Sequence, residues 1–94
     1  MPRTIEEARR NAGTRMMDLV ARIETTARDW EESKADTDRD FSKEFNLLMR
    51  DYTTQETNCE ILKVFTRYTK ERVRMAVGSL NRRGLTKQGE YQIN

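Results

Sequence analysis

A single uninterrupted helical pattern fills the first third of this chain. Between Ile5 and Trp30 an apolar residue recurs every three or four positions, and no proline falls between them. Thr4 and Glu7 have the spacing of a capping box, which satisfies the free N–H groups at the start of a helix. The pattern predicts one helix that ends near Ser33 and is about 45 Å long, at about 1.5 Å per residue.

A helix of this length has more apolar surface than a small domain needs in its own core. We therefore expect residues 1–35 to form a dimerisation helix that packs against a second copy. Small residues at the start of the stripe would allow close packing, and Trp30 would act as a wedge at its end. The expected interface residues are Ile5, Ala8, Ala12, Met16, Leu19, Ile23 and Trp30. In the alternative, the helix folds back over the domain as a further core helix.

A short acidic loop and a second helical face come next. Residues 36–40 contain three aspartates without periodicity and predict a loop, with Asp38 or Asp40 as the cap of the following helix. Residues 53–56 are poor helix formers and predict a bend at its end. The helical face between loop and bend consists of Phe41, Phe45, Leu48 and Tyr52.

Two further helix starts are predicted in the second half of the chain. Thr57 with Glu60 forms another capping-box pattern, and Thr69 can cap a helix that contains Lys70. Residues 81–84 supply cations and a glycine where that helix would end. Residues 85–93 alternate in polarity and predict a short hairpin.

This order of helix, turn, helix and hairpin resembles the winged helix-turn-helix family. The resemblance covers about 37 residues directly, from Thr57 to Ile93, and over half the chain if 41–52 is the first helix of the family. It rests on Thr57, Ile61, Phe65, Thr69, Val73, Val77, Leu80, Gly84, Leu85, Tyr91 and Ile93. It implies a mostly α fold, with a winged domain over 41–94 that ends in a small β-hairpin wing.

The charge distribution supports a nucleic-acid partner. Residues 1–60 carry ten Lys/Arg and fourteen Asp/Glu, whereas residues 61–94 carry eight Lys/Arg and two Asp/Glu. The basic half coincides with the helix-turn-helix pattern, and neutralisation of phosphates supplies most non-specific affinity for DNA.

The resemblance implies a small, sequence-specific DNA-binding protein, a transcriptional regulator that binds double-stranded DNA as a homodimer. A helix beginning at Lys70 would enter the major groove, with Lys70, Glu71 and Arg74 against the bases. Phosphate contacts are expected from Arg67, Arg82, Arg83 and Lys87. The alternative function is a protein–protein interaction module, winged or a helical hairpin, that acts as an inhibitor or assembly factor.

The alternative fold, a helical hairpin, follows from heptad spacing between Phe45 and Leu80, which would make residues 41–83 one long helix. Four of its eleven seam positions are Gln55, Cys59, Thr66 and Thr69, which make a poor coiled-coil core. Splitting the segment near Thr53–Thr57 and Thr66–Thr69 places the threonines at caps and turns, so the split is favoured.

The residue inventory argues against catalysis. With no histidine and one cysteine, the chain can build neither a zinc cluster nor a Ser-His or Cys-His pair, and it has no glycine-rich phosphate loop. We expect no enzyme activity, no metal and no cofactor. Cys59 cannot form an internal disulfide, and no apolar run predicts a membrane span or signal peptide, so a cytoplasmic location is expected.

Overall fold

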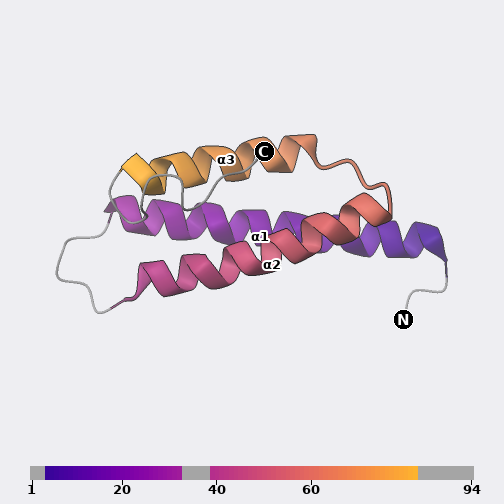
Figure 1. The fold of residues 1–94 in the computed structure, drawn as a ribbon, viewed down its shortest axis with the longest axis horizontal. Helices are drawn as coiled ribbons and strands as arrows, with labels where there is room; N and C mark the ends of the chain where they lie inside the picture. Colours follow the sequence, from indigo (N-terminus) through magenta and orange to yellow (C-terminus); the bar gives the residue numbers. More distant parts are fainter. Residues whose placement is uncertain (1–3, 33–38, 83–94) are drawn as a thin grey trace.

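The computed structural model describes residues 4–32 and 39–82, which form three α-helices. These are α1 (Ile5–Glu32), α2 (Phe41–Ile61) and α3 (Arg67–Arg82), and no strand occurs in the described residues. The long α1 lies between the other two helices and packs against both (Figure 1). α2 runs antiparallel to α1, and α3 then runs alongside α1 in the same direction as α1 (Figure 1). The mostly α prediction is confirmed.

The start of α1 follows the predicted capping pattern. The Thr4 hydroxyl accepts a hydrogen bond from the Glu7 N–H at 3.1 Å, and the Thr4 carbonyl accepts one from the Ala8 N–H. At the next helix start, the Asp40 carboxylate accepts a hydrogen bond from the Lys43 N–H at 2.9 Å. The prediction that Asp40 can cap this helix is therefore confirmed.

The core is built around one stripe of α1, which faces apolar side chains from both other helices. Fully burying one aliphatic or aromatic side chain contributes about 1.5–3 kcal/mol, so this stripe is a main source of stability. The buried side chains are Ala12, Met16, Val20, Ile23 and Ala27 of α1, Phe45, Met49, Tyr52 and Cys59 of α2, and Val73, Ala76 and Val77 of α3.

Most residues of the expected dimer interface lie inside this core or at its edge. Met16 and Ile23 are buried, as is Ala12, whereas Ala8 and Leu19 are half-buried. Trp30 packs edge-on against Phe41, with ring centroids 5.5 Å apart. Only Ile5 of this set is mainly exposed, at 58%. Dimerisation through α1 would require the core to open, and it remains a prediction.

The winged helix-turn-helix prediction is wrong, because α2 continues without a bend through residues 53–57. The threonines there do not cap a new helix. Instead, the hydroxyls of Thr53, Thr54 and Thr57 each donate to a carbonyl one turn earlier, at 2.9–3.2 Å. Tyr52 and Cys59, two turns apart, are both buried, so the segment between them stays helical. The separate helix expected from Thr57 does not form, and the expected hairpin at 85–93 lies outside the described residues.

The chain turns between α2 and α3, so residues 41–83 do not form one long helix either. Lys63 has a positive φ of 59°. The Lys63 N–H donates to the Glu60 carbonyl, and the Val64 N–H donates to the Cys59 carbonyl at 2.8 Å. This pair of bonds is a Schellman motif, which satisfies carbonyls at the end of a helix. α3 then begins at Arg67, so Thr69 lies in its first turn, and not before it as expected.

Candidate functional site

The basic side chains of α3 are the site predicted from the sequence, and most of those described are engaged in ion pairs. The Arg72 guanidinium forms a bidentate ion pair with the Glu24 carboxylate of α1, and Arg72 Nε lies 2.9 Å from Glu24 Oε2. This pairing holds the pKa of the Glu24 carboxyl below its ordinary value, against the opposing effect of burial. The Arg72 guanidinium also lies over the Tyr68 ring, 5.6 Å from its centroid.

Arg72 was not among the predicted DNA contacts, whereas the predicted base contacts Lys70, Glu71 and Arg74 are all paired. The Lys70 ammonium lies 3.7 Å from the Glu56 carboxylate of α2, and Arg74 pairs with Glu71 one turn earlier. Arg67 lies exposed at the start of α3. The predicted phosphate contacts cannot be placed in the same way. Arg82 is the last residue of α3 but its side chain is not described, and Arg83 and Lys87 lie outside the described residues.

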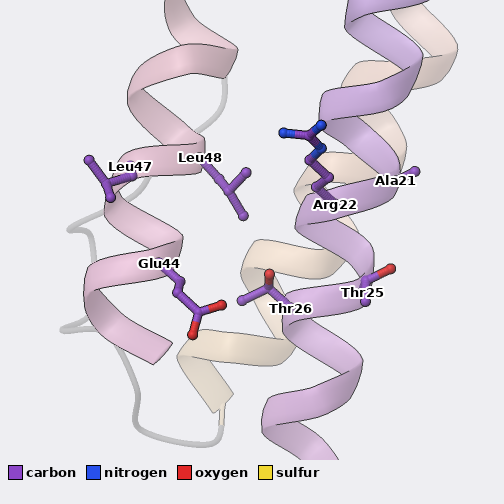
Figure 2. A pocket seen from close by; sticks show the side chains of 7 residues that line it. All are labelled: Ala21, Arg22, Thr25, Thr26, Glu44, Leu47 and Leu48. Carbon is purple, nitrogen blue, oxygen red and sulfur yellow. The ribbon is translucent and has the colours of Figure 1, made fainter. Parts of the chain in front are cut away.

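A second candidate site is a groove between α1 and α2 that the sequence did not predict. Its first segment has a volume of about 460 Å³. Figure 2 shows Leu48 of α2 and Thr26 of α1 directed toward the space between the two helices, with Arg22 above them. The segment is lined by Ala21, Arg22, Thr25, Thr26, Glu44, Leu47 and Leu48.

The groove continues along the same two helices. A second segment of about 300 Å³ is lined by residues that precede the first segment on α1 and follow it on α2, as expected for antiparallel helices. Together the two segments span residues 15–26 of α1 and 44–55 of α2, which is about 18 Å of helix. The second segment is lined by Arg15, Asp18, Leu19, Asp51, Thr54 and Gln55.

The two edges of this groove differ in charge. On the α2 edge, Glu44 and Asp51 are seven residues apart and therefore share one face of the helix. On the α1 edge, Arg15 and Arg22 have the same spacing. Asp18 lies between them and pairs with Arg22 at 3.1 Å, which reduces the positive charge of that edge.

The acidic edge is held in place at its end by Arg39. The Arg39 guanidinium donates to the Glu44 carboxylate at 2.7 Å and to the Asp29 carboxylate at 2.6 Å, and it lies 4.5 Å from the centroid of the Phe41 ring. The hydrogen bonds from Arg39 hold the pKa of Glu44 below its ordinary value, so this carboxylate stays ionised at neutral pH.

Leu48 forms the apolar floor of the groove, and Leu47 lies at its outer rim on α2 (Figure 2). Leu47, Leu48 and Met49 are consecutive, so they cover more of the helix circumference than α1 can bury. Met49 is buried, Leu48 is half-buried, and Leu47 is 50% exposed. This run of three apolar residues was the sequence signal that could have indicated the groove.

Within the described ranges, none of the helices has the length and apolarity needed to cross a bilayer. The same residues contain no cluster of three or more His, Cys, Asp or Glu side chains placed to hold a metal ion. Comparison with known proteins finds no matching family model, no similar curated protein and no similar solved structure.

Proposed function

We propose that this protein is a non-enzymatic interaction module that binds an amphipathic helix of a partner protein in the groove between α1 and α2. The observation that carries the proposal is the apolar lining of the groove, where half-buried Leu48 points between the helices and Leu47 remains 50% exposed at the outer rim on α2. A helix placed there would cover this lining and complete a four-helix arrangement. The length of the groove fits a partner helix of about three turns.

The charged edges specify the partner helix further. Asp51 would meet a basic flank, whereas Arg15 would meet an acidic flank. Glu44 and Arg22 contribute less, because they already pair with Arg39 and Asp18. The partner segment therefore has an apolar stripe at the spacing i, i+3, i+4, i+7, with opposite charges on its two sides. Reversing the direction of the helix would exchange the flanks, so the charges also select its orientation.

Selection from a displayed library of helical peptides tests the proposal. The protein should enrich peptides with this pattern, and bound peptide should shift the NMR signals of Ala21, Leu47 and Leu48. Leu47→Glu should lower the affinity for the selected peptides by at least about tenfold. Placing a charge in this apolar contact should cost about 1.4 kcal/mol or more of binding free energy. Ile61→Glu is the matched control, because Ile61 is 74% exposed and does not line the groove.

Two results would refute this function: no enrichment over the Leu47→Glu protein, or binding whose NMR shifts lie away from the groove. Sequence-specific binding of double-stranded DNA is the second candidate, and the eight Lys/Arg of residues 61–94 support it. The ion pairs of Lys70, Arg72 and Arg74 weaken that support, because phosphates would compete with carboxylates already in place. For both candidate functions, a cytoplasmic location remains a prediction.

A further inference from the structure

The outward side of α3 carries large apolar side chains that the core does not use. Tyr68 and Met75 are 69% and 74% exposed, and Phe65, just before the helix, is 83% exposed. Tyr68 and Met75 are seven residues apart and so lie on the same face, opposite the buried Val73 and Val77. We call Phe65, Tyr68 and Met75 the outer stripe.

Between Tyr68 and Met75, the outward face of α3 carries the charged residues Glu71 and Arg72. Phe65 and Tyr68 line one surface hollow of about 270 Å³ together with Glu71. The Tyr68 ring contacts the Arg72 guanidinium, and Arg72 lines the next hollow together with Met75. An exposed apolar surface of this kind usually marks an interaction site.

We propose that the outer stripe is the interface between two copies of this chain, packed with their α3 helices antiparallel about a two-fold axis. The spacing of the residues fits one register, with the axis between Glu71 and Arg72. Tyr68 then lies opposite the partner subunit's Met75, a favourable sulfur–aromatic pairing. Because a two-fold interface is self-complementary, each of these contacts occurs twice.

The remaining positions in this register are also compatible. Glu71 lies opposite the partner subunit's Arg72, so the Glu71–Arg74 and Arg72–Glu24 pairs of each chain would meet at the axis with opposite charges facing each other. Phe65, which lies just before the start of α3, would then face the C-terminal part of the partner subunit's α3. The Arg72–Glu24 and Arg74–Glu71 pairs balance the charge of the face, so two copies would not repel each other.

The surface area that the outer stripe would bury limits the affinity of the dimer. A fully buried aromatic side chain removes about 150–250 Å² from water, so two copies of the stripe would bury on the order of 1,000 Å² in total. This value is near the lower limit for a specific interface. The dimer should therefore be weak, with a Kd in the micromolar range or above.

Sedimentation velocity of the full chain, from about 10 µM to about 1 mM, tests the dimer directly. The wild type should shift from monomer to dimer mass across this range. Tyr68→Glu and Met75→Glu should each remain monomeric at the highest concentration, with unchanged helical circular dichroism. Ile61→Glu, an equally exposed position outside the stripe, should behave as the wild type. A wild type that is monomeric throughout, or a dimer that neither stripe variant weakens, would overturn the proposal.

Cross-linking tests the register. A mixture of Tyr68→Cys and Met75→Cys chains should form a disulfide-linked heterodimer under mild oxidation faster than either variant links to itself. Faster self-linking of either variant would contradict the antiparallel register. The native Cys59 is buried and does not interfere. Leu47→Glu should leave the dimer unchanged, so failure of this interface and failure of the peptide-binding groove are distinguishable.

Discussion

Lys63 lies in the turn that follows the end of α2, and its backbone has a left-handed conformation, with φ of 59°. A residue with a Cβ adopts this region at a cost of about 1–2 kcal/mol, whereas glycine adopts it freely. The surrounding structure maintains it. Leu62 and Val64 pack against the core, and the Arg9 guanidinium donates to the Leu62 carbonyl at 2.8 Å.

Lys63→Gly should therefore stabilise the protein. We expect a gain of about 0.5–1 kcal/mol in the free energy of unfolding, because relief of the left-handed strain exceeds the extra chain entropy of an unfolded glycine. Urea denaturation measures it. Arg50→Gly, on an exposed and regular part of α2, should instead lower the free energy of unfolding by about 1 kcal/mol. If Lys63→Gly instead destabilises the protein as much as Arg50→Gly does, Lys63 does not have the left-handed conformation in solution.

At the scale of the elements, α1 is the helix on which the other two depend. It packs against α2 and α3, and polar contacts add to this packing. Glu24 pairs with Arg72, the Ser79 hydroxyl donates to Glu31, and the Gln55 amide donates to the Ala12 carbonyl at 3.2 Å. The Glu24–Arg72 pair is partly buried, with side chains 29% and 26% exposed, so solvent screens it less than a surface pair.

Loss of this pair should appear in the pH dependence of stability. The folded pKa of Glu24 is lowered, so its contribution is present above the unfolded pKa, about 4.3, and is lost as the pH falls through the folded value. Glu24→Gln should be less stable than the wild type at pH 7, and this difference should shrink on acidification. Denaturation at a series of pH values measures it, with Glu60→Gln as the exposed control. A difference that is constant with pH would mean that the ion pair contributes nothing.

The sequence predicted the helices better than their boundaries. The period of three to four residues between Ile5 and Trp30 is long and uninterrupted, so α1 could be predicted nearly to its ends. Residues 53–57 could not be assigned in this way, because a threonine hydroxyl can cap a helix or bond to the preceding turn. The burial of Tyr52 and Cys59 against other helices decides between these, and the local sequence does not contain that information.

The candidate site was harder to predict for the same reason. The sequence showed that α3 is basic, but not that Glu24 of α1 and Glu56 of α2 would lie beside its cations. The groove between α1 and α2 depends on which parts of the α2 stripe remain uncovered. This is a property of packing, and Leu47 alone does not indicate it.

At the scale of the whole molecule, the fold mixes charges that the sequence separates. The first sixty residues have a net charge of −4 and the remainder has +6. Because α3 packs back along α1, carboxylates of the acidic part pair with cations of the basic part. The charge of a segment is therefore a poor measure of the field at the surface.

This neutralisation leads to a prediction for DNA. Each phosphate contact contributes about −0.9 to the slope of log affinity against log salt. We expect random duplex DNA to bind weakly, with a slope shallower than about −2, because Lys70, Arg72 and Arg74 are already paired. Fluorescence anisotropy over a salt series measures this slope. Glu56→Gln, which releases Lys70, should strengthen binding and steepen the slope by about one unit.

A regulator that reads DNA sequence predicts a different pattern. The wild type would then show a slope of several units, and Arg82→Ala or Lys87→Ala would weaken all duplexes equally and flatten the slope by about one unit each. Arg74→Ala would cost about 1–3 kcal/mol on a preferred site and relax the preference there. Observation of that pattern would reject the interaction module in favour of DNA binding, because neither the groove nor the outer stripe explains a steep dependence on salt.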